Sequence, residues 1–162
     1  MNNNKNDDIK WLDCRKKLSE SQISSIENQI CTNLPASYIS CVKNCNGGRP
    51  TKPCFEYYDI GLEETWITGV GRFLSLNKER HDNFMKSFLN PPEFFPKGLI
   101  AFAENGGGNY ICFDYREGKD NPDPPIAYWN HEADVGKDVS FVAKNFEEFL
   151  GILKEPEDEQ FY

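Results

Sequence analysis

The sequence predicts a single α+β domain, and three observations support that fold class. Apolar residues recur at helical spacing before residue 49 and at the alternating spacing of strands after it. A glycine-rich connection later joins two strongly apolar runs, as in a β-hairpin. A last helical pattern follows the strands. We therefore expect a mixed, mainly antiparallel sheet with two N-terminal helices, a middle helix and a C-terminal helix.

The N-terminal region predicts a polar tail followed by a well-marked helix. Residues 1–18 begin with an Asn-rich run and then allow only one or two amphipathic turns, so we expect a tail with a short helix. Ser19 and Gln22 have the spacing of a capping box, which places a helix over about residues 20–31. One folded domain is expected over residues 19–154, followed by an acidic tail over residues 155–162.

A second helix is expected after Pro35, whose missing N–H costs nothing in the first helical turn. Asn46, Gly47 and Gly48 then supply the positive φ angles that end a helix. The apolar face of this helix is expected to be Tyr38, Ile39, Val42 and Cys45.

The middle of the chain predicts paired strands and one helix. The runs CFEYYDIGL and TWITGVGRFLSL are rich in aromatic and β-branched residues and are separated by a short acidic turn. NKERHDNFMKSFL has near-helical spacing and stops at Pro91, so a helix is expected to cross the sheet there.

The clearest hairpin joins GLIAFAE to NYICFDY through Asn105 and three glycines, Gly106, Gly107 and Gly108. Strands are expected at PIAYWNH and VSFVAK, after a polar, proline-rich loop. Asn145 is expected to cap the final helix, FEEFLGIL, whose apolar face docks on the sheet.

The composition indicates a folded cytoplasmic protein. Apolar residues make up 38% and aromatic residues 14% of the 162 positions, enough for a hydrophobic core. No run of 18 apolar residues and no secretory segment occurs, so we expect no contact with a membrane. In the reducing cytoplasm the six cysteines are expected to remain thiols, mostly in the core: Cys14, Cys31, Cys41, Cys45, Cys54 and Cys112.

The charge argues against nucleic acid and for a protein partner. Lys and Arg number 18 against 26 Asp and Glu, which gives a net charge of -8. Because phosphate contacts need a basic patch, no direct binding of nucleic acid is expected. Acidity favours encounter with a basic protein, although solubility alone also explains an acidic composition.

No pattern typical of an enzyme or metal centre occurs, so we expect no catalytic residue, metal or cofactor. His81 and His131 do not lie in a motif that places two imidazoles on one metal. Cys41 and Cys45 could share a soft metal, but no Cys-x-x-Cys pair supplies further ligands, so buried thiols are preferred. Cys112 could act as a nucleophile if the fold brought His131 to it, yet a core position explains it better.

Exposed acidic turns are the candidates for partner contacts, with plain solvation as the alternative. The residues we select are Glu63, Glu64, Asp120, Asp123, Glu132 and Asp134. Trp66, Tyr128 and Trp129 are expected in the core, with a role as interface anchors as the alternative.

Taken in order, the motifs LPASYISCVKNCNGGRP, FPKGLIAFAENGGGNYICFDY, PIAYWNHE and NFEEFLGIL resemble the SUKH superfamily over about residues 19–153. Departures are Cys41 and Cys45, where such proteins commonly carry large apolar or charged residues, and the inserted PPEFFP. The matching positions, nearly all with a structural reason, are Leu34, Pro35, Tyr38, Asn46, Gly47, Gly48, Gly106, Gly107, Gly108, Asp114, Trp129 and Phe146.

The resemblance implies binding without catalysis, because it marks a scaffold whose faces differ among members. The leading hypothesis is an immunity protein that blocks the toxic domain of a polymorphic or contact-dependent toxin, often a nuclease. The alternative is a regulatory scaffold like the fungal cell-wall-synthesis regulator of the superfamily. An enzyme that uses Cys112 or a carboxylate is the third hypothesis. The sequence does not predict an oligomeric state.

Overall fold

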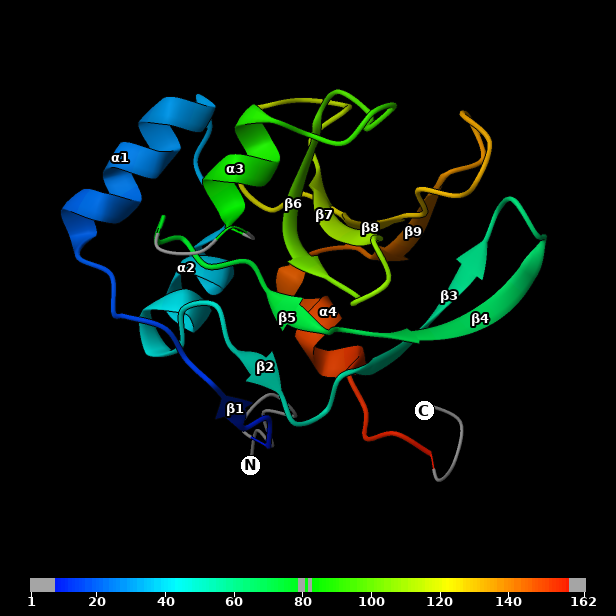
Figure 1. Cartoon of the computed structure of the whole chain (residues 1–162), viewed down its shortest axis with the longest axis horizontal. Coiled ribbons are helices and arrows are strands. Elements are labelled where there is room, and N and C mark those ends of the chain that lie inside the picture. The colour runs from blue at the N-terminus through cyan, green and yellow to red at the C-terminus, as the bar shows by residue number, and fades with distance from the viewer. Residues whose placement is uncertain (1–7, 79–80, 82, 158–162) are drawn as a thin grey trace.

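The computed structural model describes residues 8–78, 81 and 83–157 as one α+β domain (Figure 1). This confirms the predicted fold class. The elements in chain order are β1 (Trp11–Leu12), α1 (Glu20–Ile30), α2 (Ala36–Asn44), β2 (Arg49–Pro50), β3 (Cys54–Asp59), β4 (Glu64–Gly69), β5 (Arg72–Phe73), α3 (Phe84–Leu89), β6 (Leu99–Glu104), β7 (Tyr110–Asp114), β8 (Ile126–Trp129), β9 (Val139–Ala143) and α4 (Phe146–Ile152).

The main sheet is an antiparallel meander. Within the described residues its five strands follow the order β5-β6-β7-β8-β9, so each strand pairs with its neighbours in sequence. The predicted hairpin is β6–β7, with Ile100 opposite Phe113. β3 and β4 form a separate antiparallel hairpin, and β3 packs beside the edge strand β9. This hairpin projects at the right of Figure 1, near the loop that leads into β9.

Local sequence signals set the helix ends. The capping box of α1 is present, because Ser19 Oγ accepts from the Gln22 N–H at 3.2 Å and Gln22 Oε1 accepts from the Ser19 N–H at 2.8 Å. Asn145 caps α4 as predicted, its Oδ1 accepting from the Glu148 N–H at 2.8 Å. α3 begins at Phe84, and residues 79, 80 and 82 of the predicted middle helix lie outside the described residues.

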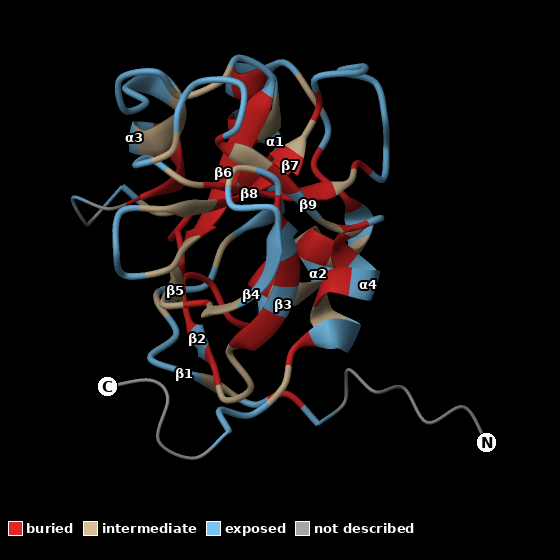
Figure 2. Cartoon of the chain, turned by 90° about the vertical axis from the view of Figure 1, so that its right-hand side faces the viewer, coloured by how far each residue is buried: buried red, intermediate tan, exposed pale blue. Residues whose placement is uncertain are grey.

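Aromatic rings fill the space between the sheet and the helices α2 and α4. Tyr38 of α2 is completely buried, and its ring meets Phe113 of β7 at 5.0 Å and Phe146 of α4 at 5.4 Å, both edge to face. Phe102 of β6 stacks on Phe113 at 4.4 Å. Figure 2 shows the buried residues concentrated along the sheet and the inner faces of these helices.

The glycine hairpin is held to the sheet by two amides. Gly106 and Gly108 have φ angles of 88° and 93°, which residues with a side chain rarely adopt. Asn105 Oδ1 accepts from the Gly107 N–H at 2.8 Å, closing the turn. Asn105 Nδ2 and Asn109 Nδ2 both donate to the Tyr128 hydroxyl, at 2.9 and 2.8 Å. The turn is therefore a structural element of the sheet.

The short helix expected within residues 1–18 is wrong for residues 8–18, the part of that segment that the structure describes. Trp11 and Leu12 form β1, which pairs with β2, and the Trp11 ring lies 4.9 Å from the Phe73 ring. Ile9 is also buried against the core. These side chains reach the core from a short extended segment and not from one face of a helix. So few apolar residues do not distinguish helical from strand spacing.

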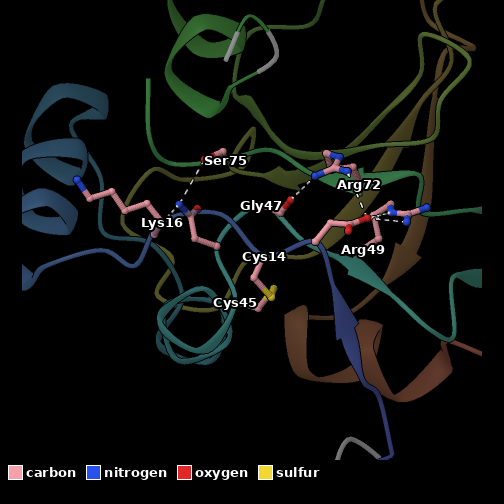
Figure 3. Close-up of a disulfide and its surroundings, with 9 residues drawn as sticks. Cys14, Lys16, Cys45, Gly47, Arg49, Arg72 and Ser75 are labelled. Atoms are coloured by element: carbon pink, nitrogen blue, oxygen red, sulfur yellow. Dashed lines mark hydrogen bonds and ion pairs between the residues drawn. A yellow bond between two sulfur atoms is a disulfide. The ribbon is translucent and has the colours of Figure 1, made fainter. Parts of the chain in front are cut away.

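The expectation that every cysteine stays a thiol is also wrong, because Cys14 and Cys45 form a disulfide across 31 positions (Figure 3). The backbone bridge between Arg15 and Asn46 brings the two segments together. Gly48 leaves room for the bond, since a Cβ there would lie 2.3 Å from Cys45 Sγ. Residue spacing alone does not report such a tertiary contact. Within the described chain, the cysteines without a disulfide are Cys31, Cys41, Cys54 and Cys112.

Candidate protein-binding surface

Exposed apolar side chains lie on two turns of the fold that adjoin each other. In the β3–β4 hairpin, Tyr58 is 54%, Ile60 41% and Leu62 58% exposed. In the loop between β8 and β9, Val135 is 74% exposed. We call residues 58–64 together with 132–135 the two-loop surface. Single exposed apolar residues are ordinary, whereas several on adjoining turns make this surface a candidate interaction site.

A buried aspartate shapes the first turn. Asp59 ends β3 and is 4% exposed, yet its carboxylate is well bonded. Asp59 Oδ1 accepts from the backbone N–H of Gly61 at 2.8 Å and of Leu62 at 3.0 Å, while Oδ2 accepts from the Tyr57 hydroxyl at 3.3 Å. This Asx-type turn directs Ile60 and Leu62 outward from the end of the strand.

A second buried aspartate shapes the other loop. Asp138 is 6% exposed, and its Oδ2 accepts from Trp129 Nε1 at 3.1 Å. Its Oδ1 accepts from the Gly136 N–H at 3.1 Å, and its carbonyl accepts from the Asn130 N–H. Gly136 takes a φ of 93°, so the chain turns sharply after Val135. The loop is thereby fixed to the core through Trp129.

The two turns touch each other. The Ile60 N–H donates to Ser140 Oγ of β9 at 3.2 Å, and a Cβ at Gly61 would lie 3.1 Å from the Lys137 carbonyl oxygen. Between them is an open hollow of about 390 Å³. Its lining residues are Asp59, Gly61, Leu62, Asn130, Glu132, Ala133, Asp134 and Lys137. Figure 2 views this end of the molecule, where exposed residues cover the loops and alternate with buried ones along β3.

Four of the six acidic residues selected from the sequence lie on this surface. Glu63 and Glu64 follow the apolar residues of the first turn, and Glu132 and Asp134 flank the hollow; all four are exposed. Glu64 also accepts from Trp66 Nε1 at 3.1 Å. The structure therefore brings together carboxylates that are about 70 positions apart in sequence.

Asp120 and Asp123 lie elsewhere. Asp120 is exposed beside a different hollow, formed where loop 119–122 meets the end of α1. Thr32 Oγ1 donates to the Lys119 carbonyl across that contact. Asp123 accepts from Asn145 Nδ2 at 3.0 Å, next to the start of α4. These two carboxylates do not join the two-loop surface.

The positions matched to the SUKH pattern are mostly structural in their contacts. Asn46 is almost fully buried, donating to the Lys16 carbonyl at 3.0 Å and accepting from the Leu76 N–H at 2.9 Å. Asp114 pairs with Arg116 at 2.8 Å. Leu34, Pro35, Tyr38, Trp129 and Phe146 are buried, and Gly47 and Gly48 pack tightly beneath the N-terminal segment.

The candidate nucleophile is poorly placed for chemistry. Cys112 is completely buried, and burial raises its pKa well above the ordinary thiol value. His131 is exposed beside the glycine turn, where its Nδ1 contacts Asn109 Oδ1 at 2.6 Å. Among the residues described, no three His, Cys, Asp or Glu side chains gather in a way that could hold a metal ion.

The described segments contain no helix with the length and apolar character needed to span a bilayer.

Comparison with known proteins identifies the family. The model of the SMI1 / KNR4 family (SUKH-1) matches residues 17–152, which is most of the chain. This chain belongs to the SUKH-1 family. The SUKH-1 match covers α1 to α4 and therefore includes both turns of the two-loop surface. The chain is also 29% identical over 154 residues to the SPbeta prophage-derived uncharacterized protein YokK of Bacillus subtilis (strain 168), covering 85% of this chain and 76% of that protein.

Sequence reasoning missed the apolar part of the surface in this SUKH-1 protein. Ile60 and Leu62 alternate with the preceding strand residues, so they were expected to continue it. The signal that could have found the turn is Asp59 two positions before Gly61, a typical Asx-turn spacing. Trp66 was expected in the core but is 46% exposed, whereas Tyr128 and Trp129 are buried as expected.

Proposed function

We propose that this SUKH-1 protein is an immunity protein that binds the toxic domain of a polymorphic or contact-dependent toxin and blocks it stoichiometrically. It acts in the cytoplasm of the cell that makes it and performs no chemistry of its own. The observation that carries the proposal is the two-loop surface, an apolar patch with an acidic border on a scaffold of the SUKH-1 family.

Binding alone is sufficient for this activity. An inhibitor that covers the substrate-binding face of a toxin needs a rigid surface of matching shape and charge rather than catalytic groups. The buried aromatic core and the bonded turns supply that rigidity. A nuclease toxin must attract phosphate and is therefore basic at its active face. An acidic inhibitor is complementary to such a face.

A neutralisation assay tests the proposal. A toxic domain that co-purifies with the tagged chain from its native cells is placed under an inducible promoter in a heterologous bacterium, with or without this chain. The proposal predicts normal growth only when the chain is present, and a purified complex of one chain per toxic domain. A variant chain that lacks four surface carboxylates should protect less well. Its substitutions are Glu63→Gln, Glu64→Gln, Glu132→Gln and Asp134→Asn.

Continued killing in the presence of soluble, folded chain would contradict the proposal. In that case the regulatory scaffold becomes the better hypothesis, and co-purification from the native cells should recover signalling or wall-synthesis proteins. Recovery of a toxic domain instead would support the immunity hypothesis.

A further inference from the structure

We propose that the two-loop surface is the contact face, and that its partner is a basic face of the toxic domain with an apolar side chain at its centre. This inference rests on the proposed function and specifies where and how the partner binds. Lysine and arginine side chains of the partner would pair with Glu63, Glu64, Glu132 and Asp134, while the apolar side chain would contact Ile60, Leu62 and Val135.

The arrangement of side chains matches a protein interface. Stable interfaces have an apolar centre that is fully dehydrated on binding, surrounded by a polar border that excludes water. Here Leu62 and Val135 supply exposed apolar area, and the hollow beside Leu62 can receive a side chain. Glu132 and Asp134 flank that hollow.

Charge decides which kind of partner fits. The two-loop surface has four exposed carboxylates, Glu63, Glu64, Glu132 and Asp134, besides the buried Asp59. With the adjoining Lys137 counted, these exposed side chains sum to a formal charge of -3. The whole chain is at -8, so its long-range field favours the same kind of partner. A basic protein face is attracted to this surface, whereas an acidic one is repelled.

A second exposed apolar pair serves as the internal comparison. Leu89, the last residue of α3, is 60% exposed, and Phe94, in the loop that follows, is 70% exposed. That segment, residues 86–97, contains Lys86, Lys97 and a single carboxylate, Glu93, for a formal charge of +1. Apolar exposure is therefore similar at the two places, but only the two-loop surface complements a basic partner.

The turns are also held in one conformation before binding. Asp59 and Asp138 each accept backbone N–H groups from the turn that they support, and Ser140 ties the first turn to β9. A surface that is already ordered loses less conformational entropy when it binds. We therefore expect the backbone of the two turns to move little on complex formation.

The test measures binding of matched variants to the toxic domain that the chain neutralises in the assay above. Leu62→Arg introduces a positive charge at the apolar centre and should weaken the affinity about 100-fold. Phe94→Arg makes the same change at the comparison site and should leave the affinity within about threefold of wild type. Both positions are exposed, so thermal unfolding should show both variants folded.

A charge variant provides a second measurement. Glu132→Lys combined with Asp134→Lys should lower the association rate constant about tenfold at low salt, with a smaller change in the dissociation rate. Added salt should slow association of the wild-type chain and have less effect on the double variant.

The outcomes separate the inference from the proposed function. Wild-type affinity in both Leu62→Arg and the double variant, with neutralisation intact, would overturn the contact face and leave immunity standing. Loss of affinity in Phe94→Arg alone would move the contact to the segment after α3 and also overturn the inference. A wild-type chain that protects cells without binding the toxic domain would contradict both the contact face and the proposed function.

Discussion

The backbone N–H of Leu62 donates a 3.0 Å hydrogen bond to the carboxylate of Asp59, so a buried acid holds the backbone at an exposed apolar residue. The same oxygen accepts from Gly61 at 2.8 Å. The bond geometry keeps Leu62 available to a partner, which links the local structure of the turn to the proposed binding.

Asp59→Ala is expected to destabilise the protein by about 2 kcal/mol, because two turn N–H groups and the Tyr57 hydroxyl lose a charged acceptor. Urea unfolding followed by circular dichroism measures the loss. Asp120→Ala, at an exposed carboxylate outside the surface, is the control and should change stability by less than about 0.5 kcal/mol. Equal stability of the two variants would show that Asp59 does not support the turn.

Reduction of the Cys14–Cys45 disulfide is expected to destabilise the fold by about 3 kcal/mol, because the bond closes a 31-residue separation and restricts the unfolded chain. The measurement is urea unfolding with and without dithiothreitol. Cys45→Ala should unfold at the same urea concentration in both conditions. Cys31→Ser, which leaves the bond intact, should keep the full effect of the reductant. Six free thiols in the folded, air-oxidised protein would contradict the pairing.

Tyr38→Phe is expected to leave the free energy of unfolding unchanged or raise it by up to about 1 kcal/mol. Among the described residues the fully buried Tyr38 hydroxyl has no hydrogen-bond partner, so removing it relieves an unpaid desolvation cost. Tyr128→Phe is the matched comparison and should cost about 1 to 2 kcal/mol, since Asn105 and Asn109 both donate to that hydroxyl. A large loss in Tyr38→Phe would indicate a bonded hydroxyl.

Iodoacetamide at pH 8 is expected to label Cys31 first, since that thiol is exposed, and to leave Cys41 and Cys112 unmodified in the native protein. Burial raises the pKa of Cys41 to about 12 and that of Cys112 well above its usual range, so neither forms the reactive thiolate. Mass spectrometry of the labelled protein locates the modification. Rapid native labelling of Cys112 would contradict its burial.

The raised pKa of Cys41 predicts that the free energy of unfolding falls at alkaline pH. In the unfolded chain a thiol loses its proton near pH 8.5, whereas native Cys41 keeps its proton until about pH 12. This contribution to stability is therefore present below about pH 8.5 and is lost as the pH rises toward 12. Cys41→Ala should show a smaller decline in the free energy of unfolding between pH 8 and pH 10.

Elements defined by local rules could be predicted from the sequence. The capping box at Ser19, the cap at Asn145 and the glycine hairpin after Asn105 each depend on residues within four positions of one another. Their hydrogen bonds are set by spacing alone, so the observed elements agree with the prediction. The α+β class follows from the change of period between the helices and the strands.

Features that depend on distant residues could not be predicted in this way. Trp11 packs on Phe73 because β1 pairs with β2, and Cys14 reaches Cys45 because Arg15 bridges to Asn46. The grouping of Glu63 with Glu132 likewise depends on β3 packing beside β9, which no local pattern reports. Acidity alone identified four carboxylates of the surface and two outside it, because composition carries no information on which loops adjoin.

The most direct test of the central claim is hydrogen exchange of the chain alone and in complex with the toxic domain that it neutralises. Our account predicts slower exchange on binding in residues 58–64 and 132–135, with residues 86–97 unchanged. Protection restricted to residues 86–97, or to the hollow at the end of α1, would contradict the claim that the two-loop surface holds the partner.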